Sequence, residues 1–265
     1  MKPAAFSYAR PQTWSDALTL VAAGARAGAG TQSLGPLLNL RLAQPDTIAD
    51  LRHLPDYAGV AVSGNVLRIG AGTTHAAIED GAVPGRTGEI MAGVARRIAY
   101  RPVRNRGTIG GSLAHADPAA DWVAVLPALG GTAIALGPQG ERRLPLAGFV
   151  TGIFETALAA DELLRAVEVP VLPAGARWGH WKFCRKVGEF SKVTACVLSV
   201  PGAAPRAVLA ALDGPPLVID DASALLADTD AEAVRIVSAF PELSEWRRAV
   251  AQTALRHAVA AVKQP

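Results

Sequence analysis

The sequence predicts an α+β protein with a mixed first part, a middle that is rich in strands and a helical end. In the first hundred positions, apolar residues recur at helical spacing behind capping residues. From Thr132 onward the pattern changes to short β-like runs, and the polar tail from Asp220 to Val262 returns to helical spacing. A chain of 265 residues in this order is expected to hold more than one hydrophobic core.

The elements of the first part follow from caps and turns. Thr13 and Ser15 are capping residues for a helix over Thr13–Ala23, and Asp117 before Pro118 is typical of another helix start. Between them we expect helices over Ser33–Leu42, Thr74–Asp80 and Glu89–Ala99, a strand over Thr47–Leu51, a hairpin of Val60–Val62 and Val66–Gly70, and a turn-rich stretch over Arg104–Asp121. The later strands are expected over Thr132–Leu136, Leu163–Val169, Trp178–Arg185, Thr194–Val200 and Val208–Leu212.

Composition excludes several classes of function. The formal net charge is only +3 and no run of Lys or Arg concentrates it, which argues against nucleic-acid binding. No stretch reaches the roughly 18 apolar residues of a membrane helix, and the start lacks the apolar core of a signal peptide, so a cytoplasmic location is expected. The charged fraction of 18% is low, so some apolar surface is expected to meet partner proteins.

Metal chemistry is not expected on this chain. Its two cysteines, Cys184 and Cys196, stand twelve positions apart, and the five histidines show no metal-binding spacing. Neither a zinc site nor an iron–sulfur cluster can be built from such a set. Any metal centre that serves this protein is therefore expected on another chain.

Three glycine-rich turns carry the strongest local signal. They are Gly28–Ser33, Gly70–Thr74 and Gly107–Ser112, called here the first, second and third glycine turns. Glycine lets the backbone approach a ligand and present N–H groups, which is how many proteins bind phosphate. The first and third turns also carry hydroxyl residues, so together they could hold a pyrophosphate; the alternative is that each glycine only permits a tight turn.

Two known phosphate motifs fit poorly or not at all. A dinucleotide-binding fingerprint requires a third glycine where the first turn has Ser33, although Asp50 lies near the offset at which such folds place a ribose-binding acid. That reading stays open as a minor alternative. The phosphate loop of ATPases requires Gly-Lys-Ser/Thr, which is absent from the sequence, and is excluded.

The polar residues after the third turn have two interpretations each. Asp121 is either a solvated carboxylate in the first turn of a helix or an acceptor for the sugar hydroxyls of a nucleotide. His115 has no suitably spaced nucleophile and is interpreted as a packed loop histidine. Basic residues such as Arg104 and Lys182 could neutralise phosphate, but a solvated face is the simpler interpretation for most of them.

Two segments resemble a known family. Ala29-Gly30-Thr31-Gln32-Ser33-Leu34-Gly35-Pro36-Leu37-Leu38-Asn39-Leu40-Arg41-Leu42 looks like the first FAD-pyrophosphate motif of the molybdenum hydroxylases, and the nineteen residues from Val103 to Asp121 look like the second. The chain thus resembles the stand-alone FAD-binding medium subunit of xanthine dehydrogenase and carbon monoxide dehydrogenase type enzymes. The resemblance covers roughly residues 1–200.

The resemblance implies a fold and a division into domains. It implies an FAD-binding domain over residues 1–170 of the PCMH type, like that of vanillyl-alcohol oxidase, with two α/β subdomains over about 1–55 and 56–170. A smaller C-terminal domain of sheet and helices is implied over 171–265, where the final stretch 220–265 matches least.

The resemblance also implies site residues. The backbones of the first and third turns would hold the pyrophosphate, Asp121 would bond the ribose or ribityl side, Ile98 would pack near the cofactor, and Leu164 and Lys182 would line the flavin. The full implied set is Gly28, Ala29, Gly30, Thr31, Gln32, Ser33, Ile98, Thr108, Ile109, Gly110, Gly111, Ser112, Asp121, Leu164 and Lys182. No catalytic side chain and no metal ligand are implied.

Two departures from the family pattern are visible. The usual Ala-Gly-Gly reads Gly28-Ala29-Gly30, and a positive φ at Ala29 would cost about 1 kcal/mol relative to glycine. The loop Arg185–Phe190 lacks the tyrosine that some relatives place over the flavin.

The implied function is an FAD-carrying electron-transfer subunit of a heterotrimeric molybdenum hydroxylase. It would take electrons from [2Fe–2S] clusters on a small partner and pass them from reduced flavin to an acceptor such as NAD or oxygen. A large partner would hold the molybdopterin, and a dimer of heterotrimers is suggested. Two alternatives remain: an assembly subunit that keeps the fold without flavin, which Ala29 favours, and a self-sufficient flavin reductase similar to the peptidoglycan-precursor reductases.

Overall fold

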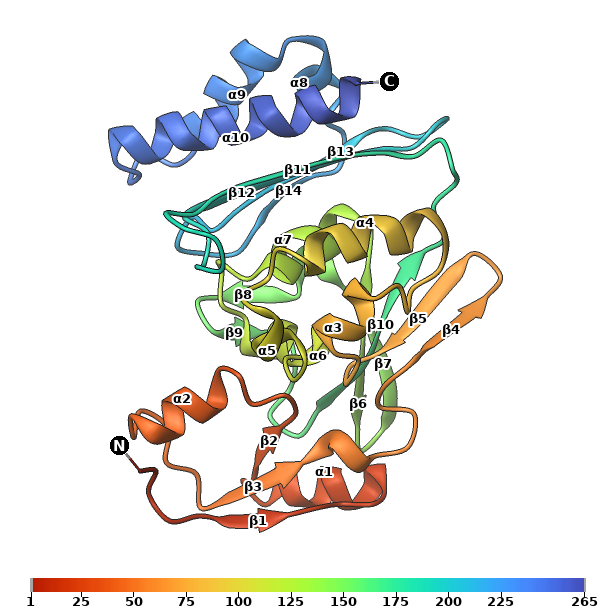
Figure 1. Cartoon of the computed structure of the whole chain (residues 1–265), viewed down its shortest axis with the longest axis vertical. Coiled ribbons are helices and arrows are strands. Elements are labelled where there is room, and N and C mark those ends of the chain that lie inside the picture. The colour runs from red at the N-terminus through yellow and green to blue at the C-terminus, as the bar shows by residue number, and fades with distance from the viewer. Residues whose placement is uncertain (1, 265) are drawn as a thin grey trace.

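The computed structural model describes residues 2–264, which form three stacked layers, each built on its own sheet (Figure 1). The first layer is a parallel sheet in the order β1-β3-β2. Its elements are β1 (Ser7–Ala9), α1 (Trp14–Ala22), β2 (Arg26–Gly28), α2 (Leu34–Asn39), β3 (Thr47–Asp50) and a short 3₁₀ turn, η1 (Leu51–His53). Because β2 and β3 are parallel, the first glycine turn emerges at the carboxyl end of β2, beside the end of β3.

The second layer is an antiparallel sheet in the order β4-β5-β10-β6-β7. Its strands are β4 (Val60–Ser63), β5 (Val66–Gly70), β6 (Thr132–Gly137), β7 (Gly140–Pro145) and β10 (Leu163–Pro170), with η2 (Leu146–Gly148) and the small β8 (Val150–Gly152) and β9 (Glu155–Thr156) pair beside them. Its helices are α3 (His75–Glu79), α4 (Gly85–Ala95), α5 (Arg101–Arg104), α6 (Ile109–His115) and α7 (Asp121–Ala128). Every residue of α7 after Asp121 is buried, so this helix lies in the core.

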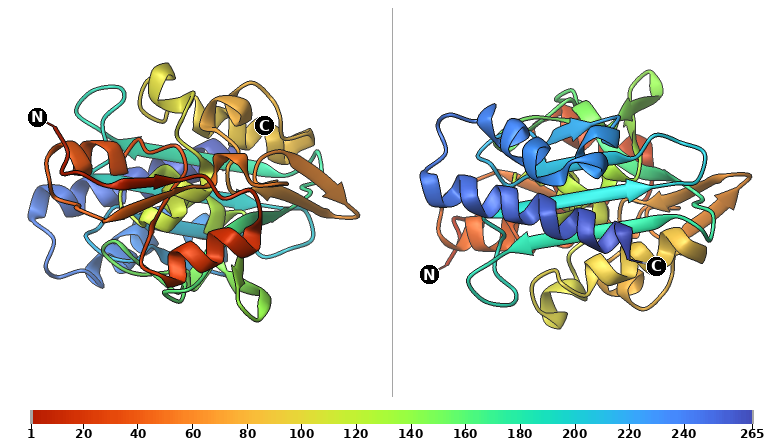
Figure 2. Two further views of the ribbon diagram at one scale, coloured as in Figure 1. Left: turned by 90° about the horizontal axis from the view of Figure 1, so that it is seen from below. Right: turned by 90° about the horizontal axis from the view of Figure 1, so that it is seen from above.

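The third layer is an antiparallel meander, β11-β12-β13-β14. It consists of β11 (Arg177–Phe183), β12 (Val193–Ser199), β13 (Arg206–Ala210) and β14 (Leu217–Ile219), followed by α8 (Ser223–Ala227), α9 (Thr229–Ser238) and α10 (Glu245–Lys263). Helix α10 lies along one face of this sheet (Figure 2), where Gly179 of β11 meets the α10 backbone. The opposite face packs on α7, so side chains that alternate along β11 point into two different cores.

The structure corrects the expected helix start at Pro118. Asp117 forms a turn instead, in which its carboxylate accepts from the Ala119 N–H and its carbonyl accepts from the Ala120 N–H, and α7 begins at Asp121. The stretch Arg104–Asp121, expected to be only turn-rich, also contains α6, and α5 ends at its first residue. Helix α6 forms despite two glycines because Thr108 caps it.

Most other elements confirm the expectation within a few residues, with α4 shifted four residues toward the N-terminus. Among the described residues, no helix combines the length and the apolar character needed to cross a bilayer.

Candidate cofactor site

The first and third glycine turns lie against each other, although almost eighty residues separate them in sequence. A Cβ added to Gly30 would overlap the carbonyl oxygen of Arg106, and one added to Gly111 would stand 4.0 Å from the Cβ of Ala29. Only glycine at position 30 allows the two backbones to come this close. The structure therefore brings together the two segments that the sequence predicts as one pyrophosphate site.

The first turn presents unused N–H groups. The amides of Gly30, Thr31, Gln32 and Ser33 donate to no other residue between positions 2 and 264, and the Ser33 side chain does not cap α2. The turn is fixed by the Gln32 side chain, which donates to the Gly30 carbonyl at 2.9 Å, and by Thr31, which adopts a left-handed φ of 58°. Consecutive free amides on one turn are the arrangement that binds an anion.

The expected strain at Ala29 is absent. Ala29 does not have a positive φ; the left-handed residue of this turn is Thr31. The substitution of alanine for the usual glycine therefore imposes no backbone penalty of the kind anticipated from the sequence.

The third turn uses most of its N–H groups in hydrogen bonds within the chain. The Ile109 amide donates to the Thr73 carbonyl and the Gly110 amide to the Ala71 carbonyl, at 3.0 and 2.8 Å. The Gly111 amide donates to the Thr108 hydroxyl oxygen at 3.0 Å. The Thr108 amide and the Ser112 hydroxyl have no hydrogen-bond partner among the described residues, so these are the donors that this turn leaves open to a ligand.

The second glycine turn supports the third. A Cβ on Gly110 would overlap Ala71, so the two backbones are in direct contact. Ala71 also donates its N–H to the carbonyl of Arg165, at 3.0 Å, which ties this turn to β10 beside Leu164. Leu164 is buried at an irregularity in the β10–β6 pairing. The second turn is thus a packing element between β10 and the predicted site.

His75 and Trp122 form a buried polar contact behind the third turn. The indole N–H of Trp122 donates to Nδ1 of His75 at 3.0 Å, and a Cβ on Gly107 would stand 2.9 Å from the imidazole. Burial, with a smaller contribution from Arg104, lowers the pKa of His75 to about 4, so the ring is neutral near pH 7. No sequence pattern indicated this pair, because the two residues are 47 positions apart.

Asp121 forms an ion pair with Lys182 in which the aspartate side chain is only 10% exposed, so the interpretation as a solvated carboxylate is wrong. The Lys182 ammonium, from β11, stands 2.8 and 2.9 Å from its two oxygens. The same ammonium donates to the Arg97 carbonyl at 2.9 Å, which uses all three of its hydrogens. Burial raises the pKa of Asp121, and the adjacent Lys182 charge opposes that rise.

Ile98 lies between this ion pair and the segment that leads into the third turn. It follows Arg97, and its own carbonyl accepts from the Arg104 guanidinium at 2.9 Å. Arg104 is buried and also forms a two-point contact with Glu79, at 2.7 and 3.1 Å, which lowers the pKa of that carboxyl. Arg104 is therefore a fixed structural residue, and Glu79 is a supporting residue that the sequence did not reveal.

Asp50 has no free capacity for a ribose. Its carboxylate accepts from the Tyr8 hydroxyl, the Arg52 guanidinium and the Arg52 amide, and the side chain is 3% exposed. These contacts hold the pKa of Asp50 well below its usual range. The geometry therefore does not support the dinucleotide-binding alternative.

The loop between β11 and β12 closes on Tyr100. The Tyr100 hydroxyl donates to the Val187 carbonyl at 2.9 Å, and Gly188, with a φ of 89°, packs on the tyrosine ring. Tyr100 lies just after Ile98 in sequence. The loop without its own tyrosine thus contacts one from the segment that follows α4.

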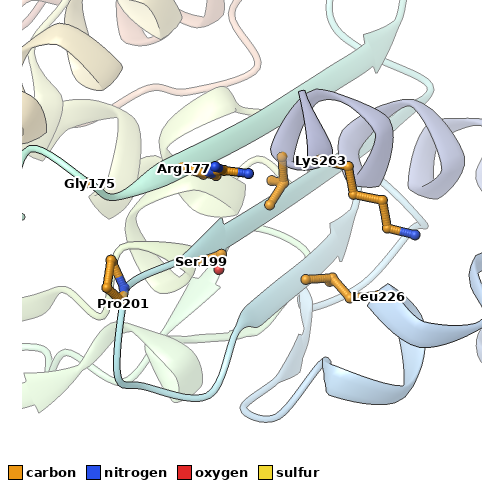
Figure 3. A pocket seen from close by; sticks show the side chains of 7 residues that line it. Gly175, Arg177, Ser199, Pro201, Leu226 and Lys263 are labelled. Atoms are coloured by element: carbon orange, nitrogen blue, oxygen red, sulfur yellow. The ribbon is translucent and has the colours of Figure 1, made fainter. Parts of the chain in front are cut away.

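A hollow of about 300 Å³ lies elsewhere, among the β11–β12 edge, α8 and the end of α10 (Figure 3). Its lining residues are Gly175, Arg177, Ser199, Pro201, Leu226, Val262 and Lys263. None of the predicted cofactor residues contributes to it, so it is separate from the candidate site.

Paired glycine turns with consecutive free amides are an arrangement that can bind an anion such as phosphate. A family model described as the FAD binding domain in molybdopterin dehydrogenase matches residues 4–172. The chain belongs to this family and is an FAD-binding oxidoreductase subunit. The match confirms the predicted family, fold class and cofactor.

Individual proteins that the chain resembles are medium subunits or chains of related enzymes. The chain is 36% identical over 200 residues to the nicotine 6-hydroxylase medium subunit of Paenarthrobacter nicotinovorans, covering 75% of this chain and 70% of that protein. It is 36% identical over 202 residues to the carbon monoxide dehydrogenase medium chain of Afipia carboxidovorans, with the same coverage. Carbon monoxide dehydrogenase from Hydrogenophaga pseudoflava superposes with a TM-score of 0.89 at 28% identity, over 99% of this chain and 98% of that one.

Proposed function

We propose that this chain is the FAD-carrying electron-transfer subunit of a heterotrimeric molybdenum hydroxylase. It would receive electrons from [2Fe–2S] clusters on a small partner and deliver them to an acceptor such as NAD or oxygen. The observation that carries the proposal is the pairing of the two glycine turns, with four free amides on the first. Medium chains of carbon monoxide dehydrogenase and nicotine 6-hydroxylase, which this chain resembles, support it.

The residues present fit FAD. The free amides of residues 30–33 would hold the pyrophosphate. Because Gly30 lies against Arg106, the third turn is close enough for the hydroxyls of Thr108 and Ser112 to complete the site. The remaining predicted contributors are Gly28, Ala29, Ile109, Gly110, Gly111, Ile98 and Leu164. When bound, the flavin supplies the redox chemistry, because it can accept electrons singly and release them in pairs.

The protein residues have positioning roles in this proposal. Asp121, from the start of α7, would accept a hydrogen bond from a ribose or ribityl hydroxyl. Lys182 would hold that carboxylate, since its three hydrogens already bond Asp121 and the Arg97 carbonyl. No side chain of this site needs to act as an acid or base.

The division of the chain near residue 170 is part of the proposal. Strands up to Pro170 pair within the first two layers, and strands from Arg177 onward form a separate sheet, which supports an FAD-binding domain over 1–170 and a smaller one over 171–265. The division of the first domain at about residue 55 agrees with the change from the first sheet to the second.

The partners belong to the proposal as well. A large subunit would hold molybdopterin and a small one the iron–sulfur clusters, as a dimer of heterotrimers in the cytoplasm. Exposed apolar side chains such as Phe154, Val187 and Phe190 provide surface that a partner could cover.

The experiment is the visible absorption spectrum of the purified full chain, followed by chromatography of the cofactor released on denaturation. We expect a flavin spectrum and released FAD. Gly111→Val should abolish FAD binding, because a Cβ at this position stands 2.8 Å from the Thr108 hydroxyl oxygen and faces Ala29. Gly35→Ala in α2, where a Cβ meets nothing within 4 Å, is the control and should bind FAD normally.

Two results would overturn the proposal. Unchanged flavin content in Gly111→Val would contradict the pyrophosphate assignment. A colourless wild-type chain that also fails to take up added FAD would favour the assembly subunit without flavin.

A further inference from the structure

The imidazole of His180 contains a buried nitrogen without a partner. Its side chain is 6% exposed, and no hydrogen-bond partner for Nε2 exists among the described residues. A buried polar atom left unpaired is unfavourable, so native proteins rarely keep one without a reason. None of the roles discussed above uses this nitrogen.

The groups that face His180 come from four elements. Lys182 lies two residues along β11 on the same face, and Cys196 is the register partner on β12. Asp121 projects from the start of α7, with Oδ1 4.0 Å from Nε2 of His180, and Arg97 follows α4. The Trp178 ring lies roughly parallel to the imidazole, at a centroid distance of 6.3 Å.

The imidazole is neutral in this setting. Burial, and then the positive charges of Arg97 and Lys182, lower the pKa of His180 to about 3. Because the Asp121 carboxylate lies 4.0 Å from Nε2 and can only accept, the favoured tautomer has its proton on Nε2, which then points at Asp121. A separation of 4.0 Å is too long for a hydrogen bond but needs only a small carboxylate movement to become one.

Asp121 has acceptor capacity to spare for such a bond. Both oxygens contact one ammonium, so the carboxylate is held at a single point and keeps unused lone pairs. If one oxygen turns toward a cofactor hydroxyl, a second donor is needed to hold the other. His180 is the unpaired donor nearest to it.

We propose that His180 is a positioning residue for Asp121, whose Nε2–H bonds Oδ1 when the carboxylate engages a sugar hydroxyl of the bound cofactor. This inference rests on the role of Asp121 proposed above. Cofactor binding would then satisfy a nitrogen that is unpaired in the free chain. Removing the imidazole should therefore have opposite effects on the free chain and on its affinity for FAD.

The test compares His180→Phe and His180→Leu with the wild type, using the deflavinated full chain. We expect the FAD dissociation constant to rise roughly tenfold, as for the loss of one hydrogen bond to a charged group. We expect the melting temperature of the free chain to stay the same or rise, because the unpaired nitrogen is gone. His180→Gln, which keeps an N–H donor, should restore affinity to within about threefold.

Two controls separate the possible failures. His257→Phe removes a histidine that stacks on Trp181 at the opposite face of β11, and it should leave FAD affinity unchanged. Asp121→Asn tests the underlying role. If Asp121→Asn weakens binding but both His180 variants bind within twofold of wild type, this inference fails alone; if Asp121→Asn also has no effect, the proposed role of Asp121 fails with it. A lowered melting temperature of the free chain in both variants indicates ordinary structural damage and also overturns the inference.

Discussion

The first and third glycine turns look alike in sequence but use their backbones differently. In the first, the amides of residues 30–33 donate to no described residue, and the only glycine in tight contact across the site is Gly30. In the third, the amides of residues 109–112 all donate within the chain, and Gly107 and Gly110 pack on His75 and Ala71. The first turn leaves its N–H groups free, whereas the third uses the amides of residues 109–112 to hold the turn together and to pack it against the second turn.

The difference shows that a glycine-rich motif does not identify its own function. Glycine permits free amides in one place and close packing in the other, and only the hydrogen-bond partners distinguish the two. The third turn depends on the carbonyls of Thr73 and Ala71, which belong to the second glycine turn. Substitutions in the first and third turns should therefore affect FAD affinity and folding stability differently.

The largest effect is expected at Gly30. Gly30→Ala places a methyl group on the Arg106 carbonyl oxygen, so the two turns must separate. We expect FAD affinity to fall at least a hundredfold and the free energy of unfolding to fall by about 3 kcal/mol, as for other overpacked backbone contacts. Isothermal titration with FAD and urea denaturation measure the two quantities.

Gly35→Ala is the matched control for Gly30→Ala. It lies in α2, five residues further along, where a Cβ meets nothing within 4 Å, and alanine favours a helix over glycine by about 1 kcal/mol. A Gly30→Ala chain that binds FAD like Gly35→Ala would show that the contact between the turns is not needed.

The next largest effect is a loss of folding stability at low pH, caused by His75 beside the third turn. His75, on which Gly107 packs, has a folded pKa of about 4 against the usual 6.5. Between these values the unfolded chain binds a proton that the folded chain does not, so stability falls as pH is lowered from about 6.5 to about 4. The loss attributable to His75 should reach roughly 3 kcal/mol at pH 4.

His75→Asn isolates this contribution. The asparagine oxygen can accept the Trp122 indole N–H but does not titrate, whereas every carboxylate and His180 remain as in the wild type. Urea denaturation at pH 7 and pH 4.5 should therefore show a smaller acid loss in the variant. Equal losses in the two proteins would mean that His75 is already protonated in the folded chain at pH 4.5.

Sequence patterns predicted many of the helices and strands because these elements carry local signals. Thr13 caps α1 as expected, and the β4–β5 hairpin flanks its predicted turn. The start of α7 was misplaced because Asp117 and Pro118 satisfy the rules for a helix start, yet the Asp117 side chain and carbonyl close a turn before the helix. Helix α6 was missed because Gly110 and Gly111 disfavour a helix; the Thr108 cap and the hydrogen bonds from Ile109 and Gly110 to the second turn offset this.

Within the site, the sequence indicated which segments meet but not how they bond. The likeness of the two motifs to a family paired residues 28–33 with 108–112, and the structure places them in contact. The Lys182–Asp121 ion pair, the Arg104–Glu79 pair and the unpaired His180 nitrogen depend on side-chain orientation between distant elements. The presence of charged residues in the sequence does not show whether they form buried ion pairs or lie on a solvent-exposed face.

The smallest effect on the free energy of unfolding is expected at Thr31 and Ala29 of the first turn. Thr31 is a β-branched residue at φ 58°, whereas Ala29 has no positive φ. Thr31→Gly should therefore raise the free energy of unfolding by up to about 1 kcal/mol, because relief of left-handed strain exceeds the entropy cost of glycine. Ala29→Gly should lower it by about 0.5 kcal/mol, since only the entropy cost applies. Urea denaturation of both deflavinated chains measures the two values. The reverse order of stability would mean that the strain of this turn lies at Ala29, which would restore that residue as the reason for a weak or absent flavin.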